Sequence, residues 1–447
     1  MMAFFTAISG LFLLLGGAEL LVRGASRLAR MMEVSPLLVG LTVVAFGTSA
    51  PELAVSIKTG LSGQSEIAVG NVLGSNIFNI LFILGISALL TPLFVTSRLV
   101  RIDVPVMIII SALAWFLARN GVIGHIECAF MLVVFVVYTG AIAVFSRRHF
   151  SSGAGKTRNS AIPLFGVKAF AASLAGILLG LGLLAFGARW LVAGASGIAR
   201  QFGVSELIIG LTLVAAGTSL PEAATSLVAS LRRERDIAVG NIVGSNIFNI
   251  LCVLAVGGLF APGGLDVSEI SLEFDMPIML AVALVCLPVF VTGGSVSRRE
   301  GVFFLSYYVL YLVLLGLRAT DSRFLPLATN VMIFVVFPAT GLMLFFSLLR
   351  SYREIIALAN AIGGNLSAAG WYAIKNARKA LVLVVGLTLI MIGLAMMVLP
   401  GPGTVVIPMG LAVLATEFLW ARRLLNRMYA EVQKAARRFI GGKEETN

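Results

Sequence analysis

Two glutamates lie in the middle of long apolar segments, each directly after a run of glycine, hydroxyl and proline residues. The runs read GTSAPE at 47–52 and GTSLPE at 217–222, so the acids are Glu52 and Glu222. A carboxylate near the centre of a bilayer costs roughly 2.5–3.5 kcal/mol even on lenient insertion scales. The basic residue nearest to Glu52 in sequence is Lys58, at the end of the segment. We therefore expect bound cations or protons to neutralise both carboxylates.

A second polar motif follows each glutamate and supplies further oxygen atoms. It reads GNVLGSNIFN at 70–79 and GNIVGSNIFN at 240–249. Ser75 and Asn79 are four residues apart and share a helix face, as do Ser245 and Asn249. Hydroxyl, amide, carbonyl and carboxylate oxygens are the hard ligands that calcium binds, about six to eight at a time. Neither motif contains histidine or cysteine, which argues against zinc or copper.

Helix packing is the alternative explanation for some of these residues, because small and polar side chains also hold membrane helices together. That explanation stays open for four residues of the second motif, namely Gly70, Gly74, Asn76 and Asn246. It does not account for Glu52 and Glu222, because packing alone does not compensate two unpaired charges.

A glycine and a proline flank the hydroxyl residues of each first motif. Pro51 and Pro221 lack an N–H group and clash with the preceding turn, so each helix should kink or unwind there. Gly47 and Gly217 lower the cost of that distortion. Carbonyl groups freed in this way are tolerated inside a membrane only where they line a cavity or pack against protein. The kinks should therefore expose oxygen ligands beside the glutamates.

The elements that must position these motifs are membrane helices. The 447 residues are 59% hydrophobic and 12% charged, with a mean hydropathy of +1.01. Apolar runs near 20 residues match the ~30 Å hydrocarbon core of a bilayer. We expect spans at about 3–22, 36–58, 67–91, 103–118, 125–145, 170–191, 206–229, 237–260, 276–293 and 301–317, and three weaker ones at 327–349, 380–398 and 404–420.

An internal repeat determines how these helices are arranged. Residues 40–81 align without a gap on 210–251, and 26 of the 42 pairs are identical. Five spans per repeat is an odd number, so the second copy enters the membrane in the opposite sense. We predict an all-α integral membrane protein with two inverted-topology repeats of five helices. This architecture places a substrate site near mid-membrane between the halves.

The basic residues predict the orientation. Loops after spans 1, 3, 5, 7 and 9 hold fifteen lysines and arginines, against four for the alternate loops. Basic loops stay on the cytoplasmic side, which puts the N-terminus outside and the C-terminus inside, in the plasma (inner) membrane. The net charge of +12 is thus a topology signal, and we expect no nucleic acid partner. We predict that the chain divides into a first repeat at 1–145, a cytoplasmic linker loop at 146–169, a second repeat at 170–325 and a C-terminal extension at 326–447.

The duplicated motifs resemble the sodium/calcium exchanger branch of the calcium/cation antiporter superfamily, over about residues 1–320. The resemblance implies four ion sites in a diamond around the kinks of spans 2 and 7. By motif position Glu52 and Glu222 would be the shared carboxylate ligands, for calcium or sodium. Further ligands implied are Thr48, Ser49, Thr218, Ser219, Ser75, Ser245, Asn79 and Asn249, with the carbonyls of Ala45 and Ala215.

One feature departs from the family pattern. Some relatives carry an aspartate at one or both of the positions of Asn79 and Asn249, whereas both are asparagine here. The site then has two carboxylates instead of three or four, which leaves the ion stoichiometry and any potassium dependence open.

The C-terminal extension resembles a different family. Its run Leu399-Pro400-Gly401-Pro402-Gly403 is similar to that of the small bacterial PGPGW transmembrane proteins, with Thr404 in place of the tryptophan. Pro-Gly-Pro-Gly indicates a tight turn between two membrane segments. The fusion suggests a role in regulation or assembly.

We expect a secondary active transporter that exchanges calcium for a monovalent cation by alternating access, most simply sodium. Protons or potassium as counter-ion are alternatives on the same fold, because a buried carboxylate can also take up a proton. A cation channel, which needs an open pathway, is the alternative of another class. We do not expect the protein to be an enzyme or to bind a cofactor, because its sequence contains no nucleophile–base pair, metal-binding histidine pair or nucleotide loop. No protein partner can be inferred from the sequence.

Overall fold

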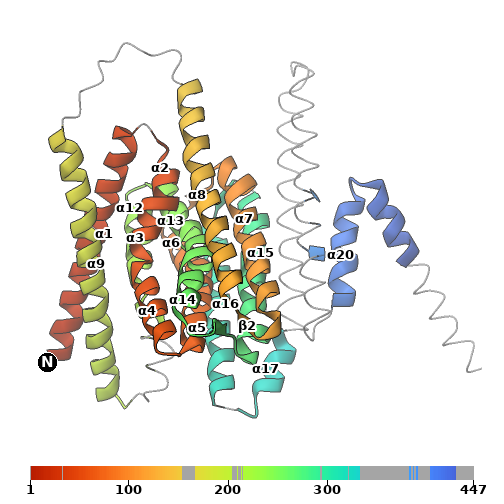
Figure 1. Cartoon of the computed structure of the whole chain (residues 1–447). Helices are drawn as coiled ribbons and strands as arrows, with labels where there is room; N and C mark the ends of the chain where they lie inside the picture. The colour runs from red at the N-terminus through yellow and green to blue at the C-terminus, as the bar shows by residue number, and fades with distance from the viewer. Residues whose placement is uncertain are drawn as a thin grey trace, which may run out of the picture. The chain divides into compact units, whose positions relative to one another are not determined.

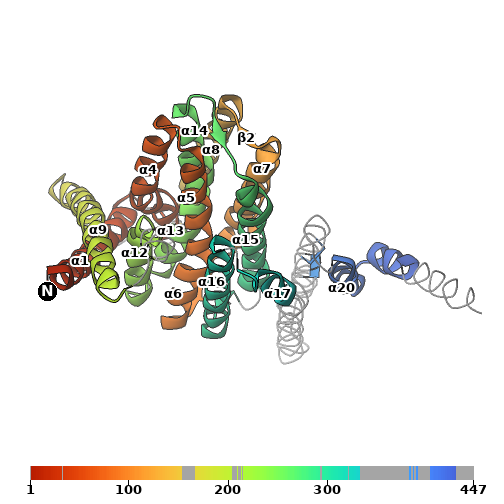
Figure 2. The ribbon, with the colours of Figure 1, turned by 90° about the horizontal axis from the view of Figure 1, so that it is seen from below.

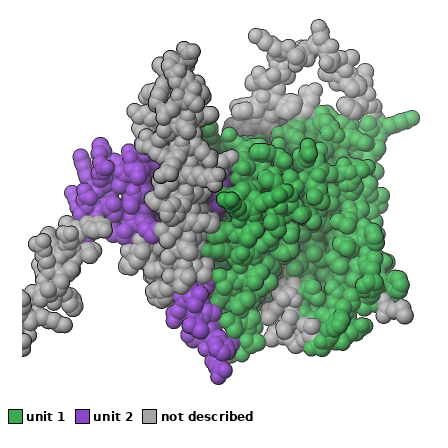
Figure 3. Space-filling view, turned by 180° about the vertical axis from the view of Figure 1, so that it is seen from behind, with its two compact units in different colours: residues 1–283, 294–321 green, residues 284–293, 322–447 purple. Residues whose placement is uncertain are grey.

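The protein was analysed as a computed structural model (Figure 1). It describes residues 2–32, 34–153, 167–203, 215–291, 294–320, 322–332 and 403–428, with 209, 213, 382–383, 386 and 389–390. These residues divide into two compact units, distinguished by colour in Figure 3. Unit 1 comprises residues 1–283 and 294–321, and unit 2 comprises residues 284–293 and 322–447.

The first repeat is helical, with short strands in two of its loops. It begins with α1 (Met2–Met31), followed by a helix built from α2 (Pro36–Val39), the π-helical turn η1 (Gly40–Val44) and α3 (Ala45–Thr48), and then α4 (Ala50–Leu61). The third span is α5 (Ser65–Phe78), the π-turn η2 (Asn79–Leu84) and α6 (Gly85–Leu90). Strand β1 (Leu93–Phe94) precedes η3 (Leu99–Asp103), α7 (Val104–Leu117) and η4 (Ala118–Asn120), and β2 (Val122–Ile123) precedes α8 (His125–Gly153).

The second repeat has the same order of elements. It comprises α9 (Val167–Gln201), α11 (Ala215–Gly217), α12 (Leu220–Leu231), α13 (Arg235–Phe248), η6 (Asn249–Leu254) and α14 (Ala255–Phe260). These are followed by β3 (Leu265–Asp266), η7 (Ser271–Asp275), α15 (Met276–Val291), β4 (Ser295–Val296) and α16 (Arg298–Ala319). The helix that should precede α11 falls at residues 204–214, which lie outside the described residues except for 209 and 213.

The lengths of the helices agree with a membrane protein. Eight continuous helices in the described part of the chain are long and apolar enough to cross a bilayer. A ninth span is formed if the bent pair 36–48 and 50–61 is taken as one. The most buried of these helices, the α5–α6 and α13–α14 spans, carry the second polar motifs and lie at the centre of unit 1 (Figure 2).

The strand pairs show that the two repeats are related by a two-fold axis. Leu93 of the first repeat pairs with Val296 of the second, and Ile123 of the first pairs with Leu265 of the second. By sequence alignment Leu93 corresponds to Leu265, and Ile123 corresponds to Val296. The β1–β4 pair thus corresponds to the β3–β2 pair when the two repeats are exchanged, which is the pairing expected for an inverted repeat.

Helices α1 and α9 are longer than their apolar segments and pack side by side at one edge of unit 1 (Figure 2). Our predicted spans 3–22 and 170–191 ended too early, because both helices continue beyond them and α1 does so with polar residues on one face only. In α1, Leu28 and Ala29 stay buried while Arg27 and Arg30 are exposed. The predicted linker loop is also shorter than its 146–169 range, since α8 extends through Gly153 and α9 begins at Val167.

Glycines at intervals of seven residues bring the axes of α1 and α9 together. A Cβ atom at Gly17 would lie 2.8 Å from the carbonyl oxygen of Gly180, and one at Gly187 would lie 2.8 Å from that of Gly10. Gly16, one position away, has nothing within 4 Å of where its Cβ would be. Close backbone approach through small residues is a common basis of helix association in membranes.

We predict that Gly17→Ala destabilises the protein and that Gly16→Ala does not. The added methyl group at Gly17 must displace the backbone of α9, and overpacking of this kind costs about 1–3 kcal/mol. At Gly16 the methyl group meets open space and only favours the helix. Thermal unfolding of the detergent-solubilised variants checks this, and equal unfolding midpoints for the two variants would contradict it.

Unit 2 is described only in part. Besides the end of α15 it contains α17 (Leu325–Val331), α20 (Gly403–Ala415) and a helix at 419–428. Leu411, Leu414 and Ala421 form a small buried cluster between the last two. The predicted spans 327–349 and 380–398 fall mostly outside the described residues, whereas 404–420 corresponds to α20 and the start of the helix that follows.

Candidate ion-binding site

The two glutamates lie at the first turn of a half-helix that follows a break. The helix 36–48 and α4 are bent by 44° at Ser49, whose backbone leaves the helical region (φ −85°, ψ 8°). Ser219 has nearly the same backbone (φ −89°, ψ 5°) before α12. Glu52 and Glu222 follow these breaks, and both are fully buried, with 0% of their surface exposed. The N-terminus of each half-helix favours the negative charge of its glutamate.

Each serine at a break donates a hydrogen bond to the glutamate of the other repeat. Ser49 Oγ donates to Glu222 Oε1 at 2.7 Å, and Ser219 Oγ donates to Glu52 Oε1 at 3.0 Å. Ser75 Oγ lies 2.9 Å from Ser219 Oγ and joins the same group. The carboxylates are thus held across the two-fold axis, and the two half-sites form one site.

The threonines of the break donate to asparagines of the other repeat in the same reciprocal way. Thr48 Oγ1 donates to Asn241 Oδ1 and Thr218 Oγ1 donates to Asn71 Oδ1, both at 3.2 Å. Asn241 and Asn71 in turn donate their amide groups to the backbone carbonyls of Glu222 and Glu52, both at 3.4 Å. Because each threonine gives its hydrogen to an asparagine, its oxygen lone pairs remain available.

Asn79 and Asn249 are oriented by a second pair of asparagines. Asn79 Nδ2 donates to Asn246 Oδ1 at 3.0 Å, and Asn249 Nδ2 donates to Asn76 Oδ1 at 3.1 Å. Both ligand candidates stand where the π-turns η2 and η6 begin. Single π-turns inside α-helices are frequent at functional sites, because they displace the helix locally and aim side chains differently.

Five buried oxygen atoms of the predicted ligands have no hydrogen-bond partner among the described residues. They are Glu52 Oε2, Glu222 Oε2, Asn79 Oδ1, Asn249 Oδ1 and Ser245 Oγ. Buried side-chain oxygens are normally paired, so a set without partners needs an explanation. Four of the five accept hydrogen bonds but cannot donate them when the carboxylates are ionised, which is the property of cation ligands.

The remaining predicted ligands are less distinct in the structure. The Ala45 carbonyl accepts the backbone N–H of Ser49 at 3.0 Å, and Thr48 Oγ1 lies 3.4 Å from the same oxygen. Ala215 begins α11, directly after residues that the structure does not describe. Within the described ranges neither glutamate has a lysine or arginine within 4 Å, since the ion pairs found there involve other residues.

Sequence reasoning did not assign Asn76 and Asn246 to the site. In the structure both are buried, and each accepts a hydrogen bond from a predicted ligand. The signal was the identity of GSNIFN in both repeats, which packing explained equally well. The expected close packing is not found at Gly70 and Gly74, where nothing lies within 4 Å of an added Cβ atom, although at Gly244 such an atom would lie 2.7 Å from the Leu41 carbonyl oxygen.

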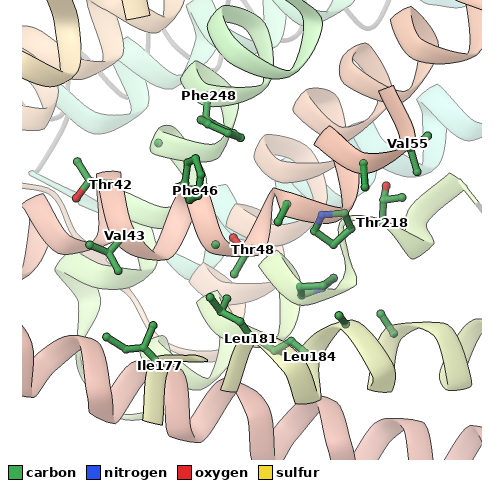
Figure 4. A pocket seen from close by; sticks show the side chains of 18 of the residues that line it. Thr42, Val43, Phe46, Thr48, Val55, Ile177, Leu181, Leu184, Thr218 and Phe248 are labelled. Atoms are coloured by element: carbon green, nitrogen blue, oxygen red, sulfur yellow. The ribbon is translucent and has the colours of Figure 1, made fainter. Parts of the chain in front are cut away.

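A large cavity of about 1320 Å³ reaches the site from the side of α9 (Figure 4). Thr48 and Thr218 lie on its wall with their glycine and proline neighbours, and leucines of α9 such as Leu181 and Leu184 face them. The cavity is mostly apolar, so the threonine hydroxyls mark the boundary between an apolar space and the oxygen-rich site.

Comparison with known families identifies the fold and its class. Residues 2–144 and 172–317 match the sodium/calcium exchanger protein family, one part for each repeat. The chain belongs to this family. It is accordingly a multi-pass membrane protein and a calcium/cation antiporter, which is a secondary transporter and not an enzyme. Residues 379–430 match the PGPGW transmembrane protein family, as the motif indicated.

Individual sodium/calcium exchanger relatives are similar over most of their length. CaxA of Alkalimonas amylolytica, whose name describes it as an antiporter, is 39% identical over 309 residues, which cover 68% of this chain and 96% of CaxA. The sodium/calcium exchanger MaX1 of Methanosarcina acetivorans is 33% identical, covering 70% of this chain and 98% of MaX1. The structure of a sodium/calcium exchanger from Methanococcus jannaschii superposes with a TM-score of 0.60 at 30% identity, covering 70% of this chain and 98% of that one.

Proposed function

We propose that the protein exchanges calcium for sodium at a site between the two helix breaks. The proposed ligands are Glu52, Glu222, Thr48, Ser49, Thr218, Ser219, Ser75, Ser245, Asn79 and Asn249, with the carbonyls of Ala45 and Ala215. The observation that carries the proposal is the set of five buried oxygens that have no partner in the described part of the chain, one of them on each glutamate. The similarity to MaX1 and to the M. jannaschii protein, both named as sodium/calcium exchangers, supports sodium as the counter-ion.

Competition for the carboxylates couples the two fluxes. One calcium ion or two monovalent cations neutralise Glu52 and Glu222, so both loads cannot be bound at once. An unneutralised pair of buried charges resists the conformational change across the membrane, because that change would carry the charges through an apolar environment. A switch between inward-facing and outward-facing states restricted to the neutralised site is alternating access.

We also propose an orientation in the cytoplasmic (inner) membrane with the N-terminus outside and the C-terminus inside. The charge count of the alternate loops supports it. The strand pairs agree with alternate crossing, because the β1 and β4 loops both belong to the basic set and the β2 and β3 loops both belong to the other set.

We predict that an outward sodium gradient drives calcium-45 into proteoliposomes of the full chain, and that potassium and proton gradients do not. Each gradient is imposed separately, with an impermeant cation replacing the omitted ion. Uptake should saturate with calcium and stop when the gradient collapses. Uptake driven by the proton gradient alone would replace sodium by protons in the proposal, and single-channel currents without counter-ion dependence would exclude exchange.

A further inference from the structure

A second, smaller cavity lies at the C-terminal end of α1. It measures about 120 Å³ and lies between α1 and the turn that joins α12 to α13. Its wall consists of Val22, Arg23, Ser26, Arg27, Arg30, Arg232 and Glu234. None of these residues belongs to the ion-binding site or to the larger cavity. Four arginines against one glutamate make this wall strongly positive.

Glu19 forms ion pairs with two of the arginines. Its carboxylate pairs with Arg23 at 2.6 Å and also with Arg232, so it links α1 to the α12–α13 turn. Arg27 and Arg30 are exposed and have no carboxylate within 4 Å among the residues that the structure describes. The positive charge around the cavity therefore exceeds what its own acids compensate.

The floor of the cavity contains a buried hydroxyl. Ser26 is 5% exposed and its Oγ has no hydrogen-bond partner within the described ranges. The wall therefore offers four guanidinium groups and a hydroxyl as donors, against one lining carboxylate, Glu234, as acceptor. Arginine forks with an added hydroxyl fit the oxygens of a phosphate group, which is a strong hydrogen-bond acceptor of compact size.

Three of the four arginines of the cavity have no basic counterpart in the other repeat. The positions that correspond to Arg23, Arg27 and Arg232 are Ala193, Gly197 and Ser62, whereas Arg30 corresponds to Arg200 and Ser26 to the similarly buried Ser196. The retention of basic residues on the cytoplasmic side accounts for their sign. It does not account for the convergence of four of them on one cavity.

The turn beside the cavity keeps a strained residue. Arg233 adopts the left-handed region (φ 63°), where its counterpart in the first repeat is Gly63 (φ 70°). A side chain in this region carries a cost that glycine avoids. The second repeat thus keeps the tight turn, with Arg233 in place of glycine. The turn places Arg232 and Glu234 against α1.

We propose that this arginine cavity binds a phosphate group. Basic pockets between membrane helices bind the headgroups of anionic phospholipids, and the cavity lies near the end of a helix that we place at the cytoplasmic surface. A cavity of this size accepts the phosphate, while the acyl chains stay along the outside of α1. A soluble phosphate is the other source of the same chemistry.

The test uses the full chain in detergent and measures its thermal unfolding midpoint. Phosphatidylglycerol, phosphatidylcholine as the reference lipid, and inorganic phosphate are titrated separately against the wild type and the Arg27→Gln/Arg30→Gln variant. Each arginine near a membrane surface contributes about fivefold to binding an anionic lipid, so the double variant should bind roughly 25-fold more weakly. Arg101→Gln, an exposed arginine on the same predicted side and outside the cavity, is the matched control.

Each possible outcome either supports or overturns the proposed phosphate site. Stabilisation by phosphatidylglycerol above the reference lipid, lost in the double variant and kept in Arg101→Gln, supports a lipid headgroup. The same pattern with inorganic phosphate supports a soluble ligand in the same cavity. Equal responses of the wild type and the double variant, or an equal loss in Arg101→Gln, overturn the proposal. Unfolding midpoints without added ligand show whether the variants are folded.

Discussion

Glu52→Gln and Glu222→Gln should each reduce calcium-45 uptake to background while leaving the protein folded. Each substitution removes one of the two charges that hold the ion. At about 4 Å and an effective dielectric constant near 20, one such charge contributes roughly 4 kcal/mol, or about three orders of magnitude in affinity. The glutamine keeps an oxygen that accepts the hydrogen bond of Ser219 or Ser49. The buried network of the apo protein therefore loses a charge and an oxygen without a partner among the described residues, but none of its hydrogen bonds to the serines.

Two measurements separate this loss of binding from a loss of structure. The unfolding midpoint of each variant without calcium should equal or exceed that of the wild type, because a buried charge has been removed. The rise in midpoint that calcium gives the wild type should disappear. Glu66→Gln, an exposed carboxylate in the first turn of α5, should change neither uptake nor the calcium response. Wild-type uptake in Glu52→Gln would sink the proposed function.

The sequence was sufficient to predict the repeat, its inversion and the position of the acids. An odd number of spans per repeat requires inversion whatever the packing, and Pro51 and Pro221 interrupt their helices for local steric reasons. The burial of Glu52 and Glu222 away from basic residues followed from the absence of lysine or arginine near the middle of those segments. These inferences depend on chain order and on local chemistry, which sequence contains directly.

Contacts between elements distant in the chain were not predictable in the same way. Glu19 pairs with Arg232, more than 200 residues away in sequence. Asp275 ends the turn η7 and accepts a hydrogen bond from Tyr311 at 3.1 Å. Neither pairing follows from chain order or local chemistry, because the partner of a polar side chain is fixed only when the helices pack.

The orienting role of Asn76 and Asn246 leads to a second large effect. We expect Asn76→Ala to reduce calcium uptake by about 10–100-fold, which is typical when a residue behind a metal ligand is removed. Asn76 Oδ1 accepts the amide of Asn249 and thereby keeps Asn249 Oδ1 free of partners. Without that acceptor the Asn249 amide can turn, and an N–H group in place of the oxygen repels a cation.

A double-mutant cycle distinguishes orientation from general destabilisation, since residues that act through one contact are not additive. If Asn76 acts through Asn249, then Asn76→Ala should cost little further activity in an Asn249→Ala protein. The same substitution in an Asn79→Ala protein should retain most of its effect, because Asn79 donates to Asn246 instead. Full additivity with Asn249→Ala would show that Asn76 supports the fold and not the ligand. Non-additivity with Asn249→Ala together with additivity with Asn79→Ala requires that each repeat orients the ligand of the other.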